Sequence, residues 1–229
     1  MHKTKKSSVE MNSLQAAVLG ANDGIVSVAG LVVGVAGNGQ SRLAILITGI
    51  AGIVAGAMSM AVGEYGSVCA ERDLQKAILD KEKQALISHP KKEFDDLVRV
   101  YEDDGLTKNE AVGVAKELSA ADALKVHADV DYQINPKKLV NPWTSAAAAA
   151  LAFILGAVIP VLAVIVPVKC NAAIPIFVAV VLALTLTGAL SAKISGAKTI
   201  RSIARVVAGG VIAMLVTYIV GNFFHTAGV

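Results

Sequence analysis

Apolar residues along the chain are gathered into five long runs, separated by short polar joints and one long charged stretch. An α-helix rises about 1.5 Å per residue, so roughly 20 apolar residues cross the ~30 Å hydrocarbon core of a bilayer. Each run reaches that length, which predicts an all-α protein with five membrane-spanning helices. The expected spans cover residues 14–36, 43–65, 144–166, 172–192 and 204–224.

The stretch between the second and third runs, residues 66–142, has a different composition. It holds 15 of the 18 acidic residues and 12 of the 21 Lys and Arg residues. We therefore expect three parts: residues 1–65 with an N-terminal tail and two spans, a helical metal-binding lobe over 66–142, and residues 143–229 with three spans. The whole chain is 55% hydrophobic with a mean hydropathy of +0.62, which is typical of an integral membrane protein.

Helical patterns continue through the charged stretch and predict a three-helix lobe. ERDLQKAILDKEKQALI follows the second span without a Gly or Pro break, so that helix is expected to continue until Pro90. KKEFDDLVRVYEDD predicts a second helix that ends near Gly105. A third helix is expected to begin at Thr107, where Glu110 three residues later completes a capping box. This helix either continues to the end of the lobe or restarts at Ser119.

Lys and Arg in the short joints predict the orientation of the chain in the membrane. Seven lie in the N-terminal tail and after the fourth span, against two in the joints of the other side. The seven are Lys3, Lys5, Lys6, Lys193, Lys198, Arg201 and Arg205, and the two are Arg42 and Lys169. Because positive charge favours the cytoplasmic side, we expect the N-terminus and the lobe in the cytoplasm and the C-terminus outside or in a lumen.

One charge interrupts the first apolar run: Asp23 lies near the middle of LQAAVLGANDGIVSVAGLVVGVA. On insertion scales a carboxylate at the centre of a bilayer costs at least ~2.5–3.5 kcal/mol, and such residues usually face a bundle interior or an aqueous path. We therefore interpret Asp23 as part of a cation or proton pathway. The alternative is a protonated side chain bonded to the backbone or to a neighbouring helix.

The second span ends in MSMAVGEYGS, where Met60 and Glu64 are one helical turn apart and share a face. A thioether is a soft ligand and a carboxylate a hard one, so the pair suits a borderline ion such as Fe²⁺. Together with Asp23, the pair provides one soft and two anionic groups along a pathway. The alternatives are that Met60 fills the core and that Glu64 is a surface residue near the membrane boundary.

Acidic residues and a histidine in the lobe are candidate ligands of a divalent metal ion. Glu93 and Asp96 are three residues apart and His127 and Asp131 four apart, so each pair shares a helix face. Glu82 lies on the expected extension of the second span. Any one of these acids alone is more often a solvated surface residue. The sequence contains no CxxC, HExxH, EF-hand or Walker motif and no basic stripe, so nucleic acid is not an expected partner.

Glycines four residues apart predict close helix contacts in the first two spans, because small residues let helix backbones approach each other. The pairs are Gly20/Gly24, Gly30/Gly34 and Gly52/Gly56. They are typical of a dense bundle or of a dimer contact, and the pattern does not choose between the two.

Three segments together resemble the vacuolar iron transporter family. They are GANDGIVSVAGLVVGVAG in the first span, AGAMSMAVGEYGSVCAERD across the end of the second, and NPWTSAAAAALAFILGAVIPVL opening the third. The order of five spans with a cytoplasmic helical lobe after the second is similar too. The resemblance implies a homodimer that exports Fe²⁺, and often Mn²⁺, from the cytosol in exchange for protons. It implies pathway roles for Asp23, Met60 and Glu64, which match the family's Asp, Met and GE[YF] positions.

The resemblance also implies metal ligands in the lobe. Acidic ligands of the family fall on Glu82, Glu93 and Asp96, whereas Ala85 replaces another. A family Met-Met-x-x-Glu stretch falls on His127, Ala128 and Asp131. The expected Met pair is therefore absent, and the lobe of this chain departs from the family pattern.

The resemblance is to a bacterial or archaeal-type member of this short build, so we expect the plasma membrane of a prokaryote; a eukaryotic chain would lie in the vacuolar membrane. The expected partners are transported metal ions, protons and the lipid bilayer, without a resident cofactor. We expect no enzymatic activity, because the sequence contains no recognisable nucleophile–base set. The alternative is a membrane-anchored metal-sensing or scaffold protein without transport, which would need the lobe but not Asp23 in a span.

Overall fold

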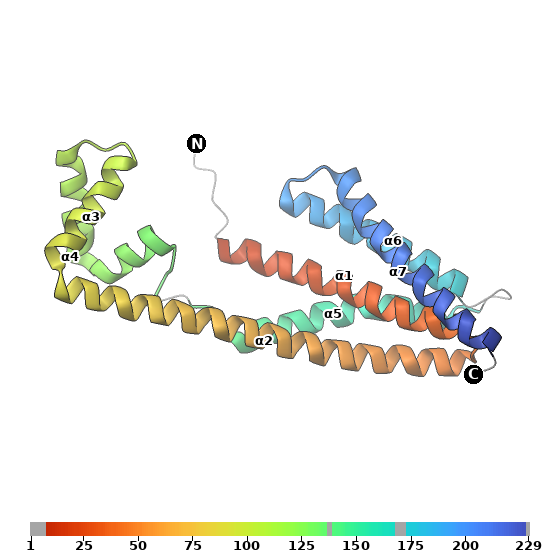
Figure 1. The fold of residues 1–229 in the computed structure, drawn as a ribbon. Helices are drawn as coiled ribbons and strands as arrows, with labels where there is room; N and C mark the ends of the chain where they lie inside the picture. Colours follow the sequence, from red (N-terminus) through yellow and green to blue (C-terminus); the bar gives the residue numbers. More distant parts are fainter. Residues whose placement is uncertain (1–7, 137–138, 168–172, 228–229) are drawn as a thin grey trace. The chain divides into compact units, whose positions relative to one another are not determined.

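The structure is a computed structural model that describes residues 8–136, 139–167 and 173–227, with the backbone alone for residues 8–15. Seven α-helices make up most of these residues, and no strand occurs among them (Figure 1). In chain order they are α1 (Ser8–Gly37), α2 (Arg42–Ser88), α3 (Pro90–Asp103), α4 (Lys108–Tyr132), α5 (Pro142–Ile165), α6 (Ala173–Ser195) and α7 (Thr199–Ala227). The expected all-α class is confirmed.

Five of these helices are long and apolar enough to cross a membrane: α1 from Ala16 onward, α2, α5, α6 and α7. The expected spans fall on these helices in the same order, although residue 172 lies outside the described residues. Some helices extend past their apolar runs: α7 begins at Thr199, whereas its run begins at residue 204. Helix α5 instead ends at Ile165, one residue before its expected end. Helical hydrogen bonds continue into polar residues, so the apolar pattern marks only the part of a helix that fits the bilayer.

The chain forms two compact units. The first contains Met1–Tyr65 and Trp143–Val229, and the second contains Gly66–Pro142. The α2 helix contributes its first part to one unit and its last part to the other. We call the first the membrane unit and the second the lobe, and we describe each by itself.

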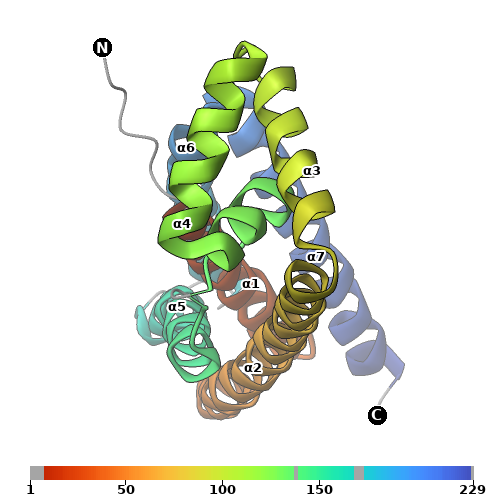
Figure 2. The same ribbon diagram turned by 90° about the vertical axis from the view of Figure 1, so that its left-hand side faces the viewer.

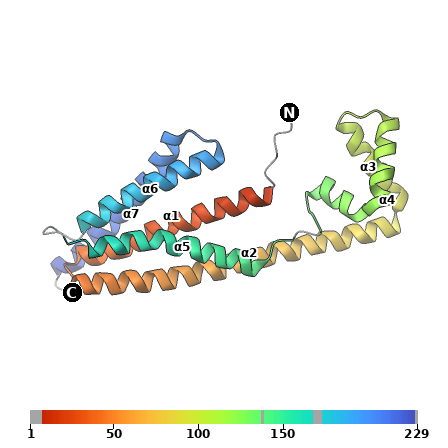
Figure 3. The same cartoon turned by 180° about the vertical axis from the view of Figure 1, so that it is seen from behind.

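Helix α1 contributes five almost fully buried side chains to the core of the membrane unit. Its residues Ile25, Val28, Ala29, Val32 and Val33 have at most 1% of their surface exposed. They pack in one apolar core with residues of α5, α6 and α7. Helices α6 and α7 pack against each other and both contact α1 (Figures 1 and 3). The helix that carries Asp23 is therefore the central element of this unit.

Glycines allow α1 to approach its neighbours at backbone distance. A Cβ on Gly24 would collide with the carbonyl oxygen of Phe153 on α5, and a Cβ on Gly156 would collide with the carbonyl oxygen of Ala21. Gly34 and Gly221 make the same kind of crossing between α1 and α7. These spaced glycines therefore pack helices within the membrane unit.

The outward faces of this unit are apolar. On α6, every fourth residue is a large hydrophobic side chain that is more than half exposed: Ile174, Val178, Leu182, Leu186 and Leu190. A continuous exposed apolar stripe on a helix of this length is typical of contact with lipid tails.

An aromatic contact joins the two points at which the chain leaves the membrane unit and returns to it. The rings of Tyr65, at the end of its part of α2, and Trp143, at the start of α5, have centroids 4.7 Å apart and are tilted by 53°. Aromatic pairs at this distance stabilise a contact beyond the area they bury. The two ends of the intervening segment, residues 66–142, are therefore anchored side by side.

In the lobe, α3 and α4 pack against each other around a small core (Figure 2). Its fully buried members are Leu97, Val98, Ala111 and Ala115. Helix α4 begins as the sequence predicts: the Thr107 backbone N–H donates to Glu110 Oε2 at 3.0 Å, and the Thr107 hydroxyl donates to the same oxygen at 2.6 Å. These bonds lower the pKa of the Glu110 carboxyl, because they favour its charged form.

The third lobe helix restarts, but at Asp122 and not at Ser119. Asp122 leaves helical geometry with φ −167° and ψ 84°. Its Oδ1 accepts a hydrogen bond from the Lys125 backbone N–H at 3.1 Å, which is the geometry of a helix N-cap. Helix α4 thus consists of two helical parts joined at this residue.

Replacing Gly24 by Ala should destabilise the membrane unit, because the added methyl group collides with the α5 backbone. Overpacking of this kind typically costs about 1–3 kcal/mol. We expect a lower melting temperature for the purified protein in detergent. Gly209→Ala on α7 is the matched control, since no atom lies within 4 Å of its Cβ position; it should be neutral or slightly stabilising. Equal melting temperatures for the two variants would contradict the close crossing of α1 and α5.

Candidate functional site

The charged side chain of the first span lies on the polar edge of α1. Asp23 and Ser27 are one helical turn apart, and the Ser27 hydroxyl donates a 2.6 Å hydrogen bond to Asp23 Oδ1. Both residues are exposed in the single chain, although the adjacent residues Gly24, Ile25 and Val28 are buried. This bond leaves Asp23 Oδ2 available to another partner.

Asp23 opens into a pocket of about 480 Å³ between α1, α2 and α5. The lining residues are Asp23, Ser27, Val28, Leu31, Gly52, Ala55, Gly56, Ser59, Met60, Gly63, Glu64 and Phe153. The structure therefore brings together the three residues of the expected pathway, Asp23, Met60 and Glu64, around one space. Sequence reasoning missed the hydroxyls of Ser27 and Ser59, although the spacing of Ser27 from Asp23 was a usable signal.

Local packing explains how α2 reaches this pocket. Met60 and Glu64 are on one face of α2, and the Met60 methyl carbon lies 3.5 Å from the position of a Cβ on Gly20. One turn before Met60, a Cβ on Gly56 would collide with the Phe153 ring of α5. The small residues of α1 and α2 thus bring a thioether and a carboxylate close to α1.

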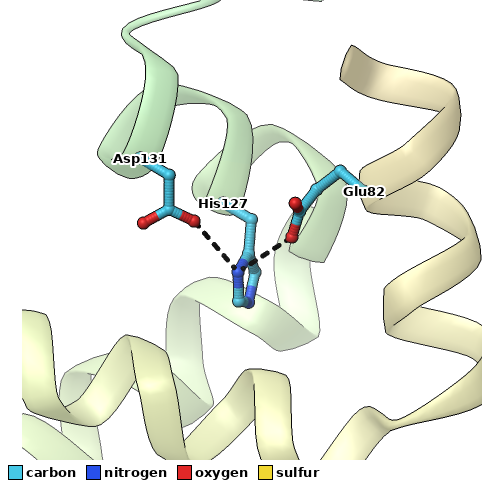
Figure 4. Close-up of side chains that lie close together, drawn as sticks. All are labelled: Glu82, His127 and Asp131. Atoms are coloured by element: carbon cyan, nitrogen blue, oxygen red, sulfur yellow. Dashed lines mark ion pairs between the residues drawn. The ribbon is translucent and has the colours of Figure 1, made fainter. Parts of the chain in front are cut away.

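A second cluster of polar side chains lies in the lobe, where α2 contributes one group and the last part of α4 contributes two (Figure 4). His127 Nδ1 is 3.3 Å from Glu82 Oε1 and 3.7 Å from Asp131 Oδ2. Glu82 and His127 are buried, with 7% and 2% of their surface exposed, whereas Asp131 is exposed. The three groups can each offer one ligand atom, and these atoms lie within 4.8 Å of one another.

The electrostatics of this cluster favour a cation. Burial raises the pKa of the Glu82 carboxyl above its usual value of 4.5; the His127 imidazole opposes this, and the Glu93 and Asp131 carboxylates add to it. Glu82 Oε1 is buried and makes no hydrogen bond, although it lies within ion-pair distance of His127 Nδ1. A divalent ion among two carboxylates and an imidazole would supply the missing partner, and these are ligand types that Fe²⁺, Mn²⁺ and Zn²⁺ accept.

The other two candidate ligands of the lobe lie outside this group of three. Glu93 is near enough to raise the pKa of Glu82, and its side chain is mostly buried. Asp96 forms ion pairs with Arg99 at 3.2 Å and with Lys92 at 3.9 Å, and its side chain is 39% exposed. Asp96 is thus already paired with cations of its own helix.

Comparison with known proteins relates this arrangement to a family. The chain matches the VIT family over residues 14–222. It belongs to that family. A vacuolar iron transporter of Acanthamoeba castellanii (strain ATCC 30010 / Neff) is 36% identical over 217 residues, which cover 94% of this chain and 80% of that relative.

Plant relatives of this VIT-family chain are similar over nearly as much of its length. Vacuolar iron transporter homolog 5 of Oryza sativa subsp. japonica is 36% identical over 219 residues, covering 95% of this chain and 83% of the relative. Vacuolar iron transporter homolog 3 of Arabidopsis thaliana is 34% identical over 217 residues, covering 93% and 85%. The resemblance to vacuolar iron transporters is confirmed, and so is an integral membrane protein.

Replacing Glu82 by Gln should raise the melting temperature of the chelator-treated protein at neutral pH. The folded-state pKa of Glu82 is raised, so its contribution to stability is present below the unfolded pKa and is lost as pH rises through the folded pKa. Gln resembles the protonated carboxyl and avoids this loss. A gain of about 1 kcal/mol corresponds to roughly 2–4 °C.

The exposed Glu117 gives the control for this prediction. Glu117→Gln should leave the melting temperature unchanged, and the difference between the variants should shrink as the pH approaches 4. A lower melting temperature for Glu82→Gln at pH 7 would mean that the ionised Glu82 carboxylate stabilises the lobe.

Proposed function

We propose that this VIT-family chain transports divalent transition-metal ions across a membrane, with Fe²⁺ as the main substrate and Mn²⁺ as a second one. The observation that carries the proposal is the pocket in which Asp23, Met60 and Glu64 meet among apolar helices. The names of the relatives as vacuolar iron transporters support iron as the main substrate. We propose neither an enzymatic activity nor a resident cofactor for this chain.

The chemistry of the pocket fits such an ion. Two carboxylates offer charge compensation, and the thioether of Met60 favours a borderline metal over Mg²⁺ or Ca²⁺. Hydroxyls of Ser27 and Ser59 line the same space and can hydrogen-bond to water carried by the ion. The pocket thus replaces part of the hydration shell of an ion without binding it in a closed cage.

The lobe is proposed to collect ions before transport. Glu82, His127 and Asp131 supply three donors, so other coordination positions remain open to water and to exchange. Glu93 and Asp96 would add negative charge nearby and attract cations to this surface. The imidazole of His127 takes the place of a softer thioether in this site, which suits a borderline ion.

The direction of transport is proposed to be out of the cytosol, in exchange for protons. The distribution of Lys and Arg in the joints supports a cytoplasmic lobe, so ions would be collected on that side. A carboxylate in an apolar surrounding binds either a cation or a proton, because each removes its uncompensated charge. Competition between the two at Asp23 and Glu64 would couple their movements. The membrane is the plasma membrane for a prokaryotic source and the vacuolar membrane for a eukaryotic one.

A homodimer is proposed for a physical reason. Asp23, Ser27 and Ser59 are exposed in the single chain, and a carboxylate that faces hydrocarbon costs at least ~2.5–3.5 kcal/mol. A second copy placed over the same face would cover the open side of the pocket and turn it into a path between two subunits. Symmetry then places two copies of each pathway residue around that path.

Asp23→Asn should abolish metal-dependent flux into proteoliposomes, and Glu64→Gln should reduce it at least tenfold, because each removes charge compensation along the path. Under an imposed pH gradient, the uptake of Fe²⁺, Mn²⁺, Co²⁺ and Zn²⁺ is measured and compared among the four ions. The pH inside the proteoliposomes is recorded at the same time. Glu117→Gln changes charge on the lobe surface and should transport as the unaltered protein does.

Two results would overturn this assignment. Transport by Asp23→Asn at the rate of the unaltered protein would exclude Asp23 from the path. Metal binding without flux in any gradient would instead favour the membrane-anchored sensing or scaffold protein.

The dimer is tested by cross-linking in a variant whose two natural cysteines are replaced by Ser. Ala55→Cys lies in the pocket wall, so a bis-maleimide should join two copies in the membrane through this residue. Leu186→Cys on the outward stripe of α6, with 73% of the residue exposed, is the matched control and should remain uncross-linked. Cross-linking through residue 186 but not residue 55 would reject the pocket face as the interface.

A further inference from the structure

The break in α4 determines where two of the three lobe donors lie. His127 and Asp131 are both on the part of α4 that follows Asp122, residues 123–132, which we call the C-terminal half-helix. Glu82 comes from α2. The three groups therefore meet only if the half-helix has one particular direction and one particular register.

Asp122 supplies the local reason for this break. No Pro or Gly lies between residues 114 and 132, so the common causes of a kink are missing. The Asp122 backbone is extended, and its carboxylate accepts the Lys125 N–H at 3.1 Å. An aspartate in this position ends one helix and begins the next, because its side chain satisfies a backbone donor that the new helix leaves free.

The half-helix is short and is held at defined points. Ten residues are too few for a stable isolated helix, so its caps and its packing decide its position. Val126 and Val130 pack against the apolar core of the lobe. At the far end, Gln133 adopts a left-handed conformation with φ 56°, and the Ile134 N–H donates to the Ala128 carbonyl oxygen at 2.8 Å.

We propose that Asp122 is a positioning residue of the lobe metal site: by starting a new helix, it holds His127 and Asp131 in the register at which they meet Glu82. This inference rests on the proposed function of the cluster as a metal site. Asp122 is not one of the three donors. It acts on affinity through the fraction of molecules in which the half-helix is already formed, because only that fraction binds with full strength.

Glu110 provides a matched comparison on the same helix. Its carboxylate also accepts a backbone N–H at a helix start, but it caps the first part of α4, which carries none of the three donors. Glu110→Ala and Asp122→Ala therefore remove the same chemical group and the same charge from two helix starts. Only Asp122→Ala alters the helix start that sets the direction of His127 and Asp131.

The test is titration of the full-length protein in detergent with Co²⁺, which resists oxidation, followed by calorimetry. The binding that His127→Ala loses defines the lobe site. Asp122→Ala should weaken that binding roughly threefold or more, since loss of a cap exposes the half-helix to fraying. Asp122→Asn should restore it, because Asn caps as well as Asp. Glu110→Ala should lower the melting temperature without changing the dissociation constant.

Three other results would contradict the positioning role of Asp122 or the metal site itself. Unchanged affinity in Asp122→Ala, or an equal loss in Glu110→Ala, would overturn the positioning role while the metal site stands. Equal binding by His127→Ala and the unaltered protein would overturn the proposed site and this inference with it. If Asp122→Ala does not fold, Asp122→Gly replaces it, because Gly weakens a helix cap less than Ala does. Asp122→Gly should then lower the Co²⁺ affinity by a smaller factor, and Asp122→Asn should leave it unchanged.

Discussion

A carboxylate within the apolar part of a membrane protein must be hydrogen-bonded, neutralised or hydrated, and this constraint governs the membrane unit. Asp23 meets it in two ways. It accepts a bond from Ser27, and it faces a pocket rather than the lipid-directed stripe seen on α6. The rest of α1 is buried against its neighbours. The unit therefore places this carboxylate at a pocket among helices whose buried core is mainly apolar.

The position of Asp23 depends on its neighbour in the sequence. Gly24 brings α1 into backbone contact with α5. Asp23 directly precedes Gly24, so its position is fixed close to the point where the two helices cross. Met60 then reaches α1 from α2 because Gly20 leaves room for it, while Gly56 leaves room for the Phe153 ring of α5. The glycines that pack these helices and the polar residues of the pocket therefore lie on the same few turns of α1 and α2. A change that loosens the crossing would also move the polar groups, even where it touches none of them.

Periodic and local features of the fold could be predicted from the sequence, whereas contacts between distant segments could not. The five apolar helices and the capping box at Thr107 follow from spacing alone. The meeting of Glu82 with His127 does not, because it depends on how two separate helices pack. The restart at Asp122 lies between these two cases. The sequence left open whether the helix continues or restarts at Ser119, since Ser and Asp are both good caps, and the structure has the restart at Asp122. Likewise, the pairing of Asp96 with Arg99 depends on side-chain rotamers that spacing allows but does not require.

The Tyr65–Trp143 ring contact has a consequence for how such a chain is assembled. Because these rings lie side by side, residues 66–142 form an insertion whose two ends are already joined. Closing a loop between adjacent ends costs little conformational entropy, and it depends only weakly on the length of what is inserted. The spans can therefore be linked by a large folded module or by a few residues with little difference in strain. Recruitment or loss of the lobe would then be a modular event, open to exchange between proteins without redesign of the helices that cross the membrane.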